Sequence, residues 1–153
     1  MESGNILKFL ILLFVFTGCS KEETQGDLIS YKVLKEDLLS YHQEQKLPSQ
    51  ELFLEGEQEW REFLGTLAEY DSSRALKLEE IEINFDTTSL IVIVEEFQVD
   101  CCNSIEVSGI YERKDKVIVV YHIKDHPGVG FAALSQAIKI LEIPKTVLPV
   151  EFE

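Results

Sequence analysis

Two adjacent cysteines, Cys101 and Cys102, are the residues of this chain whose type and spacing point most directly to chemistry. Three interpretations are open. The pair can be a structural turn or buried thiols, which is the ordinary outcome, or it can form a vicinal disulfide, or it can belong to a ligand site. A disulfide between neighbouring residues closes an eight-membered ring and is strained and easily reduced, because the two Cα atoms sit at the short limit of the allowed spacing.

A zinc site is the sharpest version of the ligand hypothesis. A β-hairpin centred near Lys114 places Cys102 opposite His126 and Glu106 opposite His122. Cys101, Cys102, His122 and His126 would then supply the ligand types of a structural zinc site. Adjacent cysteines point to opposite faces of a strand, and the usual Cys-x-x-Cys spacing is absent. We therefore expect no cofactor, an exposed loop His126 and a partly buried strand His122.

Catalytic arrangements are weakly supported. His122 can pair with Ser104 or Ser108 and a carboxylate, but neither serine has the glycine-flanked context of a nucleophile elbow. A dyad of either cysteine with His126 lacks any sequence neighbour that would lower a thiol pKa. Carboxylate pairs such as Glu79-Glu80 and Glu95-Glu96 are expected to be solvated in a chain with 28 acidic residues. We expect a protein that is not an enzyme.

The third cysteine, Cys19, closes a segment with a different chemistry. Residues 9–16 are eight consecutive apolar residues, followed by Thr17-Gly18-Cys19. As a helix, this run spans roughly 12 Å, which is too short to cross a bilayer but fits the apolar region of a signal peptide. Small residues before a cysteine resemble a lipobox. Residues 1–18 are therefore predicted to be a lipoprotein signal peptide, and Cys19 the lipidated residue.

Residues 19–27 are polar and are predicted to form the lipid-anchored linker. Ser20-Lys21-Glu22-Glu23 resembles the start of lipoproteins that are exported to the cell surface. The expected location is the bacterial cell envelope, as an outer-membrane lipoprotein that can be surface-exposed. The net charge of −14 argues against a nucleic-acid partner and against docking on anionic headgroups by charge, so the covalent lipid is the expected link to the membrane.

Elements that position these residues can be recognised from periodicity over residues 28–153, which we expect to form a single domain. Trp60, Phe63, Leu64 and Leu67 follow the spacing of one helix face within residues 57–67. Residues 90–94 are continuously apolar, as in a strand buried on both faces. The segments 51–55, 105–111, 117–123, 137–143 and 147–152 are further predicted strands, 112–116 a hairpin loop and Gly109 a bulge, whereas 28–34 can be a strand or the start of a helix and 36–45 is ambiguous. The predicted fold class is α+β, a mostly antiparallel β-sheet with one amphipathic helix packed against it.

This order of elements resembles a known family. The Glu-x-Glu-Trp segment at residues 57–60, Asn84-Phe85-Asp86-Thr87-Thr88-Ser89 before a buried strand, and Ile143-Pro144-Lys145 before Val150-Glu151-Phe152 are similar to the PrcB C-terminal domain family, which is named after an accessory component of a protease complex. The resemblance covers roughly residues 50–152. Residues 100–103, Asp-Cys-Cys-Asn, replace the Gly-Gly-Tyr turn of many members. The family contains many small bacterial lipoproteins. Because the subunit that gives the family its name is an accessory to a protease and is not itself catalytic, the resemblance implies a non-catalytic binding or assembly module accessory to a secreted protein complex. The alternative is a thiol- or metal-dependent module centred on Cys101-Cys102.

Overall fold

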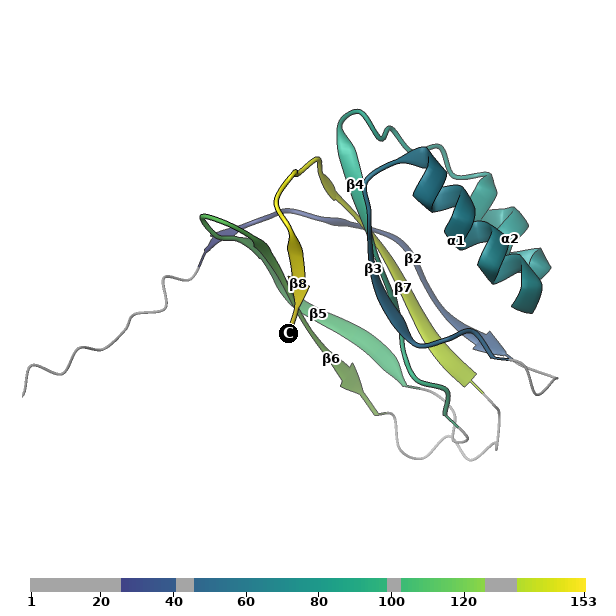
Figure 1. Cartoon of the computed structure of the whole chain (residues 1–153). Helices are drawn as coiled ribbons and strands as arrows, with labels where there is room; N and C mark the ends of the chain where they lie inside the picture. The colour runs from purple at the N-terminus through teal and green to yellow at the C-terminus, as the bar shows by residue number, and fades with distance from the viewer. Residues whose placement is uncertain (1–25, 41–45, 99–102, 126–134) are drawn as a thin grey trace, which may run out of the picture.

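The computed structural model describes residues 26–40, 46–98, 103–125 and 135–153, and its fold is α+β, as predicted (Figure 1). The described residues form two helices and two four-stranded sheets. The elements in chain order are β1 (Asp27–Leu28), β2 (Lys32–Ser40), β3 (Gln50–Leu54), α1 (Glu57–Tyr70), α2 (Ser72–Glu79), β4 (Thr88–Val94), β5 (Ser104–Glu112), β6 (Val117–Lys124), β7 (Ser135–Pro144) and β8 (Val150–Phe152).

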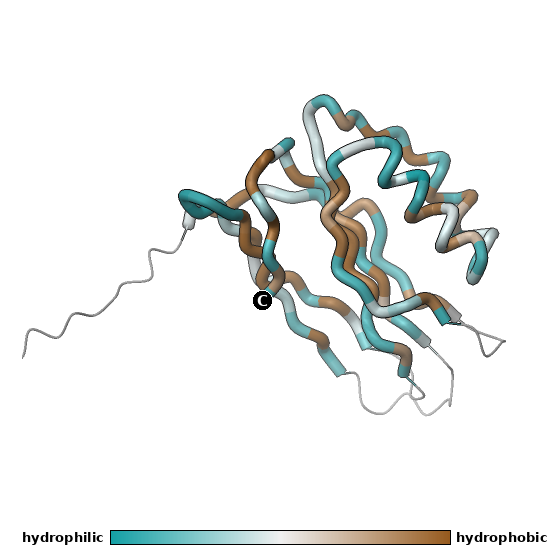
Figure 2. The backbone as a smooth tube through the Cα atoms, viewed as in Figure 1, coloured by the Kyte–Doolittle hydropathy of each residue, from teal (hydrophilic) through white to brown (hydrophobic). Residues whose placement is uncertain are grey.

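The two sheets and the helix pair form three layers. One sheet has the strand order β2-β7-β4-β3 and is antiparallel throughout; the helices cover one face of it (Figure 1). The other sheet has the order β1-β5-β6-β8, with β8 parallel to β6, and lies against the opposite face. Apolar residues concentrate along the strands that meet in the middle of the molecule (Figure 2).

Strand β4 explains why residues 90–94 are continuously apolar. Leu90, Val92 and Val94 belong to the core beneath the helices, whereas Ile91 and Ile93 belong to the core between the sheets. Successive side chains of a strand point to opposite faces, so a strand in the middle layer needs apolar residues at every position. The prediction of a central strand buried on both faces is confirmed.

The helical layer holds one predicted helix and one that was not predicted. All four apolar positions of the first pattern are buried on α1, whose N-terminus is closed by Glu59 Oε2 accepting from Gly56 N at 3.2 Å. The prediction of a single helix is wrong, because α2 follows after Asp71, whose Oδ1 accepts from Arg74 N at 3.0 Å. Only Ala75 and Leu78 of α2 are buried, too few for a helical period to be visible in the sequence.

The N-terminal described segment passes from one sheet to the other. β1 pairs with β5, and β2 pairs with β7 along nearly its whole length, so Leu28 and residues 32–40 of the two ambiguous segments are in strands. Residues 29–31 link the two strands, and residues 41–45 lie outside the described residues. A bulge between Val33 and Lys35 shifts the register. Leu34, the extra residue of the bulge, packs towards the helical core, as Leu39 does, whereas Leu38 packs between the sheets.

The hairpin β5–β6 has the predicted register. Glu106 lies opposite His122, and an irregularity falls between Val107 and Gly109, where a bulge was expected. Several predicted bounds are wrong: Glu112 still belongs to β5 rather than to the loop, β8 begins at Val150 rather than at residue 147, and β3 ends at Leu54 rather than at residue 55.

Candidate functional site

Four of the five predicted site residues lie outside the described residues. This holds for Cys19, Cys101, Cys102 and His126, so the lipidation, disulfide and zinc hypotheses stay predictions. Only His122 of the four proposed zinc ligands is described. Among the described residues, no group of three or more His, Cys, Asp and Glu side chains is arranged to hold a metal ion.

His122 lies between a serine and a carboxylate on the outer face of the β5–β6 hairpin. Its Nδ1 is 3.4 Å from Ser108 Oγ, and its Nε2 is 3.2 Å from Glu106 Oε2. The order serine, imidazole, carboxylate is that of a hydrolytic triad. Cross-strand pairing of Glu106 with His122 and the bulge beside Ser108 bring the three side chains together.

Exposure makes this set a poor nucleophilic site. The side chains of His122 and Glu106 are 56% and 42% exposed, and Ser108 is exposed as well, so water is not excluded from them. Lys124 Nζ lies 2.5 Å from Glu106 Oε1, and this hydrogen bond, with the charges of Lys124 and His122, holds the pKa of Glu106 below its ordinary value. These four side chains form a solvent-exposed row of cross-strand polar contacts between β5 and β6.

A second polar cluster lies where β3, β4 and β6 approach one another. Here a cavity of about 420 Å³ is lined by Glu51, Glu95 and Tyr121, among others. The Tyr121 hydroxyl donates to Glu51 Oε1; burial, followed by this bond and the charge of Glu51, raises the pKa of Tyr121 to about 12. The phenol therefore stays protonated and ties β6 to β3.

Glu95 differs from the solvated carboxylate expected for the Glu95-Glu96 pair. Asn103 Nδ2 donates to Glu95 Oε1 at 3.2 Å, but Oε2 is buried and has no hydrogen-bond partner in the described part of the chain. Burial, with the charges of Asp125 and Glu96, raises the pKa of Glu95 despite the bond from Asn103. The expectation is correct for Glu96 and for Glu79-Glu80, which are exposed.

Lys139 is a buried cation that sequence reasoning missed. It lies in the middle of β7 with its side chain 9% exposed; Nζ donates to the carbonyl of Ile105 in the opposite sheet and is 3.3 Å from Glu36 Oε2. The contacts join three strands across the gap between β2 and β5, where the two sheets share no backbone pairing. The sequence feature that could have indicated a buried cation is the lysine in the middle of the mostly apolar segment 137–143.

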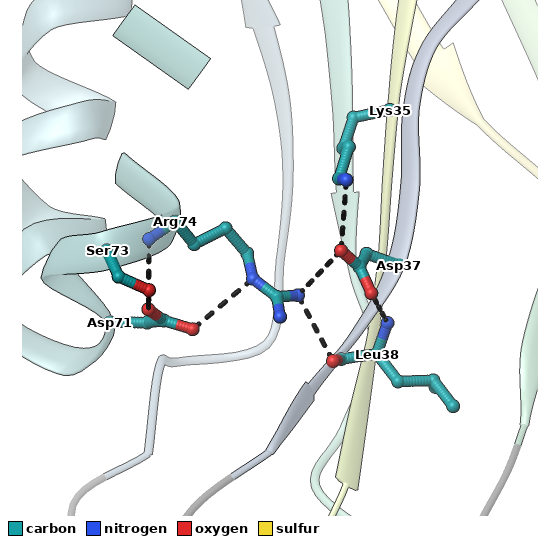
Figure 3. A network of polar contacts seen from close by, with 6 residues as sticks. All are labelled: Lys35, Asp37, Leu38, Asp71, Ser73 and Arg74. Atoms are coloured by element: carbon teal, nitrogen blue, oxygen red, sulfur yellow. Dashed lines mark hydrogen bonds and ion pairs between the residues drawn. The ribbon is translucent and has the colours of Figure 1, made fainter. Parts of the chain in front are cut away.

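The third polar cluster joins α2 to β2 and is drawn in Figure 3. Arg74 Nη1 lies 3.0 Å from Asp37 Oδ2 and donates to the Leu38 carbonyl at 3.1 Å, while Nε lies 3.2 Å from Asp71 Oδ2. Burial alone would raise the pKa of Asp37, but the bonds from Lys35 and from the Leu38 N–H, with the charge of Arg74, hold it below its ordinary value.

These side chains also protect the edge of β2. The N–H of Leu38 donates to Asp37 Oδ1 at 2.8 Å, and its carbonyl accepts from Arg74, so both backbone groups are bonded by side chains (Figure 3). An unpaired strand edge invites pairing with another chain, and bonded backbone groups oppose it. The cluster therefore has a structural role at this edge.

Comparisons with models of protein families, with curated proteins and with solved structures found no match. The similarity to the PrcB C-terminal domain family accordingly stays a prediction from the sequence. Among the described residues, neither helix is long and apolar enough to cross a membrane.

Proposed function

We propose that this chain is a lipid-anchored, non-catalytic binding or assembly module of the bacterial cell envelope, accessory to a protein complex. The observation that carries the proposal is the apolar run of residues 9–16 followed by Thr17-Gly18-Cys19. Diacylglycerol on the cysteine sulfur, at ~0.8 kcal/mol per buried methylene, would hold the chain stably on a bilayer.

The position of the first strand supports a short tether. β1 begins at Asp27, so the eight peptide units from Cys19 to Asp27 span at most about 29 Å when fully extended. The fold would then stay within one protein diameter of the membrane. Gly26 is held against the hairpin, since a Cβ there would lie 2.2 Å from the Glu112 carbonyl oxygen.

Exposed apolar side chains follow this tether. Leu28, Tyr31 and Val33 are 69%, 37% and 45% exposed, and all lie within seven residues of Asp27. Single exposed apolar residues are common on protein surfaces, but three within one short segment beside the proposed anchor give a partner at the membrane apolar side chains to contact.

The anchor can be tested with one substitution. Cys19→Ala should move the protein from the membrane to the soluble fraction and abolish labelling by an alkyne fatty acid in intact bacteria. Cys101→Ser is the matched control, since it removes a thiol from the same chain and should retain the lipid. Unchanged membrane association and N-terminal processing in Cys19→Ala would refute the placement.

The binding role needs a second experiment. Affinity isolation of the wild-type protein from detergent-solubilised native membranes should recover a protein partner in stoichiometric amount. The Cys19→Ala variant, kept from the membrane, should recover less of it. Repeated recovery of the wild-type protein alone would refute the assembly role while leaving the anchor intact.

A further inference from the structure

A pocket of about 290 Å³ lies between α2 and β2; we call it the α2–β2 pocket. Its lining carries three cations, Lys35, Arg74 and Lys77, and one carboxylate, Asp37. The whole chain has only 14 basic residues against 28 acidic ones. Three of these 14 cations line this one pocket. The lining has a net charge of three minus one, or +2; Asp71, which contacts Arg74, lowers the local sum to +1.

The same pocket has an apolar side. Leu34, Leu78 and Ile81 contribute to its lining and pack against the helical core. Leu34 reaches this position because the β2 bulge breaks the alternation of side chains, which leaves it beside Lys35 on the pocket. A binding site for a small molecule typically combines apolar walls with a few fixed polar groups. Such sites have volumes of roughly 300–1,000 Å³, so this pocket is at the lower limit and suits a small ligand.

We propose that the α2–β2 pocket binds a small organic anion, whose charged group meets the three cations and whose apolar part packs on the aliphatic wall. The proposal does not depend on the lipid anchor.

Arg74 is held ready for such a ligand. Its Nε and Nη1 contact two carboxylates and one carbonyl, whereas Nη2 has no hydrogen bond or ion pair to the described residues. A guanidinium whose orientation is already set loses little side-chain entropy on binding an anion. Lys77 has no ion pair within the described part of the chain, so its charge is not neutralised by a neighbouring carboxylate.

Benzoate is a suitable probe because it has both features, and two relatives lack one each. Benzamide keeps the ring without the charge, and acetate keeps the charge without the ring. Each would be titrated into the isotope-labelled full-length chain in non-ionic detergent, with backbone amides and the Arg74 Nε–H observed by NMR. Benzoate should give saturable shifts at Arg74, Leu34 and Ile81, with a Kd of about 1–10 mM or tighter, and both relatives should bind at least about fivefold more weakly.

Lys77 supplies the matched variants, since it lies outside the network that holds Arg74. Lys77→Gln should weaken benzoate binding by about fivefold, as expected for loss of one charged contact, and Lys77→Arg should restore it. Lys114→Gln removes an exposed charge on the hairpin loop and should bind as the wild type does.

Three results would overturn the proposal: no saturable shifts with benzoate up to about 20 mM, equal binding of benzamide, or unchanged binding by Lys77→Gln. None of these readouts involves membrane association or a protein partner. The pocket proposal can therefore be refuted while the proposed anchor is retained, and the anchor can be refuted while the pocket proposal is retained.

Discussion

The contribution of Lys139 to the contact between the two sheets can be tested by measuring the free energy of unfolding of Lys139 variants. Lys139→Ala removes three buried methylenes, worth ~0.8 kcal/mol each, and leaves the Ile105 carbonyl without its donor, at ~1 kcal/mol. The sum is about 3 kcal/mol; relief from burying an ammonium offsets part of it, so we expect a loss of about 2–3 kcal/mol. Lys139→Met keeps an apolar side chain of similar length and should cost less than about 1 kcal/mol.

Urea unfolding can measure these differences. Trp60 is the only tryptophan, is buried against Phe63 at a ring distance of 5.7 Å, and reports on the layer beneath the helices; far-ultraviolet circular dichroism reports on the whole fold. Lys114→Ala on the exposed hairpin loop is the control and should stay within about 0.5 kcal/mol of the wild type.

The Ala and Met variants separate packing from charge. If Lys139→Met destabilises the protein as much as Lys139→Ala, the ammonium and not the buried stem carries the stability, and the sum above is wrong. If Lys139→Ala behaves like the loop control, the side chain does not join the sheets. Glu36→Gln should cost ~1 kcal/mol or less in the wild type, because Glu36 is half exposed, and nothing in the Met background.

Four further predictions concern the polar clusters and the cysteines. Asp37 has a lowered pKa, so its contribution to stability is complete above its ordinary value of 3.8 and is lost as the pH falls through the folded-state pKa; Asp37→Asn should flatten this loss in urea midpoints measured against pH. Glu95 has a raised pKa, so the sign is opposite: stability falls as the pH rises from its ordinary value of 4.5 through the folded-state pKa. Glu95→Gln should therefore stabilise the fold at pH 7 by on the order of 1 kcal/mol and give no gain at pH 3. Asp71→Ala should lower the unfolding free energy by about 1–2 kcal/mol through loss of the α2 cap, and Asp71→Asn by less. Purified protein should contain less than about a tenth of an equivalent of zinc, and a near-stoichiometric content that disappears in a Cys101→Ser, Cys102→Ser double variant would contradict this.

The correctly predicted parts of the fold are segments whose own sequence shows a regular pattern of buried side chains. The apolar run at residues 90–94 fits only a strand that has a hydrophobic core on both faces. In α1, the buried side chains form one continuous stripe from Trp60 to Leu67. The hairpin register followed from alternation on both sides of one polar loop, which is why the pairing of Glu106 with His122 was correct.

The missed features depend on contacts between distant segments. α2 is two turns long, is closed by Asp71 and is joined to β2 through Arg74, whose partners Asp37 and Leu38 lie 36 or more residues away in the chain. Lys139 sits in a run that reads as an ordinary buried strand, and its partners, Glu36 and the Ile105 carbonyl, come from two other strands. Local periodicity contains no information about either partner.

The direction of β5 connects the proposed tether to the cysteine pair. Its last residue, Glu112, pairs with Asp27 beside the tether, and its first residue, Ser104, follows Asn103, the first described residue after Cys102. Nine strand residues rise by roughly 3.3 Å each, so Asn103 lies about 30 Å from the point where the tether enters the fold. A chain lipidated at Cys19 would be tethered at the Glu112 end of the hairpin, since a tether of at most about 29 Å enters the fold at Gly26. We therefore expect cross-linking from the Asn103 end to capture protein more readily than lipid, and preferential capture of lipid from this end would contradict the expectation.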